Sequence, residues 1–221
     1  MVRLPQPKVE RSFRSSISLQ VTRDGEILVK APYFAPNSAI NRFLLEKEEW
    51  ILKSLQKVGT VRSRVKQYKE GEYFCFLGEE HMLTFYDGIE IKAENRKLLF
   101  PKALQFRIQK ELPSWFVQKA KEKIMERLAL HSNQMQTRYG EVLFSDTKSK
   151  WGTCFADNSL QFSWRLIMAP LLVLDYVVIH ELAHTTEKNH SASFWRRVGR
   201  FTPAYRQHRK WLNEYGSRLV V

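Results

Sequence analysis

The chain has 221 residues, of which 43% are hydrophobic and 27% are charged, a balance that excludes intrinsic disorder and is typical of a folded globular protein. Its 36 lysines and arginines exceed its 23 acidic residues, so the formal net charge is +13. The two cysteines, Cys75 and Cys154, form no Cys-x-x-Cys pair, which excludes a disulfide scaffold and a thiolate zinc finger and suits a reducing compartment.

The first hundred residues predict a β-rich domain that contains one helix. Apolar runs at 16–19 and 27–29 flank Arg23-Asp24-Gly25, which predicts a hairpin. Asn37 or Ser38 can cap a helix that continues to about Lys57 with an apolar stripe on one side. Further strands are expected at 73–77, 81–86, 89–93 and 97–100.

From residue 101 the apolar residues follow a helical period. A long helical pattern from about 103 to 139 is expected to break near Pro113, with Ser114 as the cap of its second part. Three strands are expected at 141–146, 151–155 and 159–164, and further helices after Pro170, Ser191 and Pro203. The two regions predict an α+β protein with a β-rich N-terminal domain at 1–100 and a second domain at 101–221.

The chain shows no membrane-spanning pattern. Its most apolar stretch, 166–179, is broken by Pro170 and Asp175 and is shorter than the ~20 residues that a spanning helix needs. The N-terminus is basic but lacks the apolar run of a secretory signal. We therefore expect a cytoplasmic protein without a membrane partner.

Residues 180–184 read His-Glu-Leu-Ala-His. On a helix, residues four positions apart project from one face about 40° apart, so His180 and His184 can bind the same metal ion. Glu181 lies beside them, where it can accept a proton from a metal-bound water. The surrounding residues are apolar nearly all round the helix, and burying this trio without a metal or a partner is costly. A pair of core histidines satisfied by hydrogen bonds is the structural alternative.

A catalytic zinc site needs a third protein ligand and an open fourth position. His190 is favoured, because Asn189 can take the left-handed conformation that turns the chain back toward the metal. Glu214 is the alternative, since it is the only carboxylate after His190. The remaining histidines carry no motif and are expected at the surface: His81, His131 and His208.

Several segments resemble, in chain order, the YgjP-like metallopeptidases, which are relatives of the SprT-like and WLM zincins. The matching segments are 150–154, 163–166, 169–170, 174–184, 189–191 and 194–195. Thr153 and Ser163 stand where the family usually has Ser and Asn. The resemblance implies a zincin-like domain, in which a small mixed or antiparallel sheet and flanking helices pack on the motif helix. It also implies one zinc ion bound by His180, His184 and His190, with Glu181 as the base.

Three functions are weighed. The leading hypothesis is a zinc metallopeptidase that cleaves polypeptides with a water molecule activated by the metal and Glu181. The second keeps this site but hydrolyses a nucleotide or another phosphoester, because the basic surplus suits an anion. The third is a nucleic-acid-associated protein with a structural metal, which the absence of cysteine ligands and the presence of Glu181 disfavour.

Two further residues are candidates for substrate binding. Tyr205 is of a type that donates to a developing oxyanion in zincins. Arg165 is suited either to a substrate carboxylate or phosphate, or to a structural salt bridge. The strand expected at 159–164 is either an edge on which a peptide adds as an extra strand or a buried central strand.

The C-terminal segment combines basic and aromatic residues. This pattern predicts contact with a polyanion, with nucleic acid as the leading candidate, and a solvated basic face as the alternative. The residues concerned are Arg196, Arg197, Arg200, Arg206, Arg209, Lys210 and Arg218, interleaved with Trp195, Tyr205 and Trp211.

Overall fold

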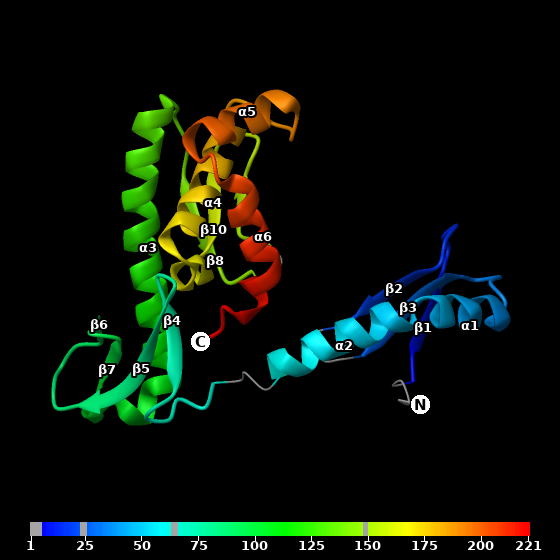
Figure 1. The fold of residues 1–221 in the computed structure, drawn as a ribbon, viewed down its shortest axis with the longest axis horizontal. Coiled ribbons are helices and arrows are strands. Elements are labelled where there is room, and N and C mark those ends of the chain that lie inside the picture. Colours follow the sequence, from blue (N-terminus) through cyan, green and yellow to red (C-terminus); the bar gives the residue numbers. More distant parts are fainter. Residues whose placement is uncertain (1–5, 23–25, 63–65, 148–149) are drawn as a thin grey trace. The chain divides into compact units, whose positions relative to one another are not determined.

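The computed structural model describes residues 6–22, 26–62, 66–147 and 150–221 (Figure 1). The chain divides into two units, Met1–Val65 and Lys66–Val221. The turn expected at Arg23-Asp24-Gly25 lies outside the described residues. The strands at 73–101 share one hydrophobic core with the helices that follow them. Residue 101, where the apolar period changes, therefore lies inside the second unit and does not separate two units.

The first unit is a three-stranded sheet with two helices. Its strands are β1 (Lys8–Ser12), β2 (Ser18–Val21) and β3 (Ile27–Pro32), in the order β1-β3-β2, with β2 antiparallel and β1 parallel to β3. Instead of the single expected helix, α1 (Asn37–Glu46) and α2 (Glu48–Arg62) are separated at Lys47. The core combines alternate β3 residues with the helices: Ile27, Val29, Ala31, Ile40 and Ile51.

The expected cap of this helix is wrong. Pro36 occupies the cap position of α1, and no side chain satisfies the helix N-terminus there. The Asn37 side chain instead accepts a hydrogen bond from the Arg11 guanidinium at 2.7 Å. The Asn37 side chain therefore binds Arg11 of strand β1 instead of capping the N-terminus of α1.

The second unit begins with a four-stranded sheet. Its strands are β4 (Tyr73–Phe76), β5 (Glu79–Tyr86), β6 (Lys92–Glu94) and β7 (Lys97–Pro101), in the order β4-β5-β7-β6. Gly78, in the β4–β5 turn, has φ +84°, and a Cβ there would lie 2.7 Å from the Pro170 Cα. The turn therefore packs directly against the start of the helix that carries the histidine motif. His81 is buried against Phe76 in this sheet, so its expected surface position is wrong.

The long helix is continuous. A short 3-10 helix, η1 (Lys102–Arg107), leads into α3 (Ile108–Met135), and Pro113 lies within α3 without ending it. Pro113 is close to the helix start, so its missing N–H removes a single backbone bond. Ser114 donates its hydroxyl to the Lys110 carbonyl at 2.8 Å and caps nothing. One buried stripe explains the length of the helix: Ile108, Leu112, Phe116, Ala120, Ile124, Leu128, His131 and Met135.

A second small sheet positions the motif helix. It contains β8 (Val142–Ser145), β9 (Gly152–Cys154) and β10 (Leu160–Ser163) in the order β8-β10-β9, with β8 parallel and β9 antiparallel to β10. The strand expected at 159–164 is therefore central, and β9 is an edge. A 3-10 helix, η2 (Trp164–Met168), connects this sheet to the motif helix α4 (Leu171–His184).

Helix α4 lies between α3 and the C-terminal helices α5 (Ala192–Phe201) and α6 (Tyr205–Tyr215), which are followed by a short 3-10 helix, η3 (Gly216–Arg218) (Figure 1). Its residues are buried on almost every side, as the apolar pattern predicts. Within the described ranges, no helix combines the length and apolar character needed to cross a bilayer.

A buried ion pair joins α4 to α3. The Arg127 guanidinium donates to both carboxylate oxygens of Asp175, at 2.6 and 2.8 Å, and the His131 Nε2 lies 3.1 Å from the same carboxylate. Burial raises the pKa of Asp175, but the hydrogen bonds from His131 and Arg127 outweigh it and leave the pKa below its usual value. His131 is therefore a buried partner rather than the expected surface residue.

Candidate metal centre

Three histidines meet at the C-terminal end of α4. His180 and His184 lie on successive turns of the helix, and His190 lies in the loop before α5. The Nε2 atom of His190 is 3.1 Å from that of His180 and 3.2 Å from that of His184. Ligand nitrogens of a tetrahedral zinc site lie about 3.3 Å apart when each Zn–N distance is about 2.0–2.1 Å. The His190 nitrogen thus lies at the spacing of a zinc ligand from the nitrogens of both helix histidines.

The loop that brings His190 to the helix turns by a different device from the one expected. Asn189 is not among the described residues with positive φ. Its side-chain oxygen accepts from the Ser191 N–H at 3.2 Å, and Ser191 in turn caps α5 by accepting from the Phe194 N–H. The cap at Ser191 is confirmed, whereas the left-handed conformation expected of Asn189 is wrong.

Aromatic rings hold the imidazoles in place. The His184 ring stacks on Phe194 with centroids 4.4 Å apart, and the His190 ring stacks on Trp195 at 5.6 Å. Phe194 is fully buried, so its ring gives the His184 imidazole a fixed packing surface. Both aromatic residues belong to the first turn of α5, which explains why the Ser191 cap matters for the site.

The protonation of the histidines suits a cation. The Nδ1 atom of His184 lies 2.9 Å from the Glu187 carbonyl and donates to it, so the Nε2 lone pair faces the cluster. Burial, followed by the neighbouring His184 and His190, lowers the pKa of His180 to about 3, and its ring is neutral. Neutral imidazole nitrogens are preferred zinc ligands, so these residues fit a bound zinc ion.

Glu214, the alternative third ligand, lies elsewhere. It is exposed on α6, where it is 3.8 Å from Lys210. It is not part of the group of potential ligands that the three histidines form.

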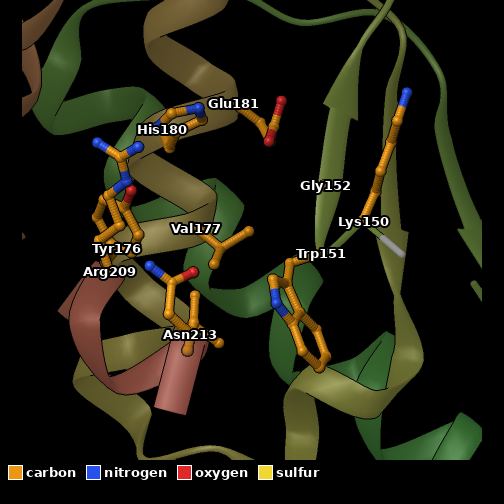
Figure 2. Close-up of a pocket in the computed structure, with 10 residues that line it drawn as sticks. Lys150, Trp151, Gly152, Tyr176, Val177, His180, Glu181, Arg209 and Asn213 are labelled. Atoms are coloured by element: carbon orange, nitrogen blue, oxygen red, sulfur yellow. The ribbon is translucent and has the colours of Figure 1, made fainter. Parts of the chain in front are cut away.

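Glu181 is buried between α4 and the edge strand β9. Its side chain points toward Gly152 (Figure 2), and a Cβ on Gly152 would lie 2.5 Å from the Glu181 Oε1. The absence of a side chain at Gly152 therefore makes room for the carboxylate. Burial raises the pKa of Glu181 to about 8, although the Cys154 backbone N–H and the Lys150 ammonium oppose the shift.

A cavity of about 230 Å³ opens beside Glu181 and His180 (Figure 2). Four further polar residues line this cavity, and none of them belongs to the His-Glu-Leu-Ala-His motif: Lys150, Tyr176, Arg209 and Asn213. The position of Tyr176 was available as a signal, because a residue four positions before His180 shares its helix face. Burial raises the pKa of Tyr176 to about 12, although Arg209 opposes the shift, so its hydroxyl remains a hydrogen-bond donor.

Two further cavities lie nearby. One, of about 320 Å³, is lined by Tyr176, His180, His190, Trp195 and Arg209. The other, of about 450 Å³, is lined by Trp195, Tyr205, Arg206, Arg209, Lys210 and Asn213. The candidate Tyr205 thus lines the outer cavity but neither of the two cavities that His180 lines, and it stacks on Trp195 with centroids 5.1 Å apart.

Arg165, the other candidate for substrate binding, is buried. Its guanidinium donates to Asp146 at 2.8–2.9 Å and to the Leu219 carbonyl at 3.2 Å. These partners tie the C-terminus to the loop after β8, and they agree with the structural salt bridge that sequence analysis weighed as the alternative.

The basic C-terminal residues fall into separate groups. Arg196, Arg197 and Arg200 line a cavity of about 570 Å³ beside the end of α3. Arg206, Arg209 and Lys210 belong to α6 and line the outer cavity near the histidines. Arg218 stacks on Tyr215.

The family model described as YgjP-like, metallopeptidase domain, matches residues 15–215. A search of the curated proteins and a search of the solved structures each found no match.

Proposed function

The chain belongs to the YgjP-like metallopeptidase family, and from this premise we propose that it is a zinc-dependent metallopeptidase that hydrolyses peptide bonds in polypeptides. Membership of this family indicates a metal-dependent hydrolase. The observation that carries the finer assignment is the convergence of three imidazole nitrogens beside a buried glutamate and an open cavity. A structural zinc site is closed by four protein ligands and needs neither the glutamate nor the cavity.

Each residue of the site has a distinct task. His180, His184 and His190 would hold one zinc ion, which supplies an activated water and polarises the scissile carbonyl when bound. Glu181 holds the proton taken from the nucleophile and passes it to the leaving amine. Tyr176 borders the same two cavities as His180 and donates its hydroxyl to the substrate oxygen, a role that the more distant Tyr205 is less well placed to fill.

The edge strand β9 provides the surface on which an extended peptide adds. Gly152 begins this strand, and its Cα lies directly beside the Glu181 carboxylate. Backbone hydrogen bonds from β9 would therefore align the peptide with the base. The central strand β10 pairs with β8 on one side and β9 on the other, so it does not offer such an edge.

A second candidate function is supported by the cations in the cavity. Lys150 and Arg209 favour an anionic substrate, so hydrolysis of a nucleotide or another phosphoester at the same site remains the alternative. A nucleic-acid-associated protein with a structural metal is less well supported, because three protein ligands leave the fourth metal position open.

Both cysteines are free thiols, which suits a reducing compartment, and we propose the cytoplasm as the location of the protein.

The function is tested with the zinc-loaded protein. Unfolded casein and a set of nucleoside triphosphates are incubated with it in parallel, and new amino termini and released phosphate are measured. We expect new amino termini from casein, complete loss of this activity with a zinc chelator and recovery when zinc is returned. Phosphate release without casein cleavage would replace the peptidase by the phosphoester alternative.

Gly152→Ala is expected to lower peptide hydrolysis by about tenfold to a hundredfold while zinc content stays unchanged. The new methyl group would lie 2.5 Å from the Glu181 Oε1, so the carboxylate must move away from its working position. Misplacement of a reacting group by about 1 Å costs up to about 10²-fold in rate. Turnover and zinc content are measured in the same preparation.

Gly199→Ala is the matched control for this substitution. A Cβ at Gly199 would meet the Tyr205 ring at 3.6 Å, an ordinary contact, so activity should be unchanged. Full activity in Gly152→Ala would show that the position of the Glu181 carboxylate does not depend on the space left by this glycine.

A further inference from the structure

Arg209 borders all three cavities around the histidine cluster. It lines the cavity beside Glu181, the cavity beside His190 and the outer cavity along α6. Figure 2 shows Arg209 next to Tyr176 and His180. The guanidinium charge reaches both neighbours, since it contributes to lowering the pKa of His180 and opposes the rise in the pKa of Tyr176. A substrate group entering from any of these cavities therefore meets the same cation.

The cavity beside Glu181 has a surplus of positive charge. Lys150 and Arg209 line it, and Glu181 is its only acidic residue. Among the described residues, neither cation has a carboxylate within salt-bridge distance. A dication held by the histidines would add to this positive field. The cavity is thus electrostatically complementary to an anionic group.

Arg209 lies against an aromatic cluster. Its guanidinium carbon is 5.5 Å from the Trp195 ring centroid, a cation–π contact. Trp195 itself stacks on His190 at an interplanar angle of 25° and on Tyr205 at 19°. A cation–π contact occupies no N–H donor of the guanidinium, so these donors are left for a ligand. Within the parts of the chain that the structure describes, these donors make no hydrogen bond.

Three arginines of this unit have structural partners. Arg127 is bound to Asp175 through two hydrogen bonds, and Arg165 is bound to Asp146. Arg197 donates to the Met135 carbonyl at the end of α3. Arg209 is exposed and lines the cavities beside the histidines, and among the described residues its side chain has no such partner.

We infer that Arg209 determines substrate specificity by binding a carboxylate next to the scissile bond, so that the protein acts on acidic polypeptides. A planar guanidinium matches a carboxylate through two parallel hydrogen bonds, and Lys150, which lines the same cavity, adds a second positive charge. The inference rests on the proposed peptidase function and names the substrate class of that site.

The test uses peptides that are identical except for Glu, Gln or Lys at the positions flanking the scissile bond. We expect kcat/KM to be about tenfold to a hundredfold higher for Glu than for Gln at one of these positions, the range for charged hydrogen bonds. Arg209→Gln should abolish the preference, and Lys150→Gln should reduce it. Arg200→Gln should leave it intact, because Arg200 is an exposed arginine of α5 that lines a different cavity.

Binding separates this inference from the peptidase proposal. The same peptides are titrated calorimetrically into zinc-loaded Glu181→Gln protein, with and without Arg209→Gln, after melting curves have established that each variant is folded. Tighter binding of the Glu peptide that depends on Arg209 supports the inference even if no peptide is cleaved. Cleavage without a preference for Glu, or a preference that survives Arg209→Gln, overturns it and leaves the peptidase proposal standing.

Titrations with phosphate compounds show whether Arg209 binds a carboxylate or a phosphate. Inorganic phosphate and a nucleoside triphosphate are titrated into the same proteins. Binding of the triphosphate that depends on Arg209, together with equal binding of the Glu and Gln peptides, would assign Arg209 to a phosphate and overturn the carboxylate assignment. If Arg209→Gln does not fold, Arg209→Lys replaces it: a reduced preference for Glu in this variant supports the inference, and an unchanged preference overturns it.

Discussion

Glu181→Gln is expected to reduce peptide hydrolysis by about 10²–10⁴-fold, the usual range for loss of a general base. Glutamine keeps the shape and volume of the side chain but cannot accept the proton. Glu181 is only 5% exposed and fits closely against Gly152, so a side chain of the same shape should keep the packing. Zinc content and melting temperature should therefore remain nearly unchanged. Zinc, melting and turnover are measured in the same preparations of both proteins.

Glu214→Gln is the control for this change. Glu214 is an exposed carboxylate on α6 that is close to Lys210, and exposed pairs of this kind contribute little to stability. Its replacement should alter neither zinc content nor hydrolysis. Activity that survives in Glu181→Gln would refute the proposed role of this residue. Loss of zinc in the same variant would make Glu181 a ligand and require a new ligand set.

The core of the site was accessible from the sequence because it is local. His184 lies four positions after His180 on one helix, and helix geometry alone puts them on one face with Glu181 beside them. The structure brings His180 and His184 together with His190. The loop conformation was harder to predict, because the turn depends on a side-chain hydrogen bond from the Ser191 N–H to Asn189 rather than on backbone propensity.

The cavity could not be predicted in this way, because it is assembled from distant segments. Lys150 precedes β9, Tyr176 lies on α4 and Arg209 lies on α6, and only tertiary packing makes them neighbours. A basic run at 196–218 looks uniform in the sequence. Helix packing divides it, so that Arg209 reaches the site while Arg200 lines another cavity.

The remaining differences in the fold have similar physical causes. Pro113 was expected to break the helix, but the buried stripe of α3 outweighs the loss of the backbone hydrogen bond that proline cannot make. His131 was expected at the surface because no motif contains it. Its partner Asp175 lies far away in the sequence, and their contact with Arg127 is a property of the packed helices.

His190→Ala is expected to lower zinc content well below one ion per chain. His180 and His184 would remain as a pair on α4, without the nitrogen that lies 3.1 and 3.2 Å from theirs. Loss of an outer-shell partner already costs about 10–100-fold in metal affinity, and loss of a ligand should cost more. Zinc is measured by elemental analysis after dialysis against a weak chelator.

His208→Ala is the matched control, because His208 lies near the site but outside the ligand group. The His208 ring centroid is 6.2 Å from that of Tyr176, and His208 is not one of the three grouped histidines. The His208→Ala protein should therefore keep its full zinc content. Full zinc occupancy in His190→Ala would refute the third ligand, and loss of zinc in Glu214→Gln would restore the carboxylate alternative. The comparison is informative because His190 lies outside the helix motif. A chance motif on a buried helix would not need a histidine from another segment beside it, whereas a catalytic zinc site requires a third protein ligand.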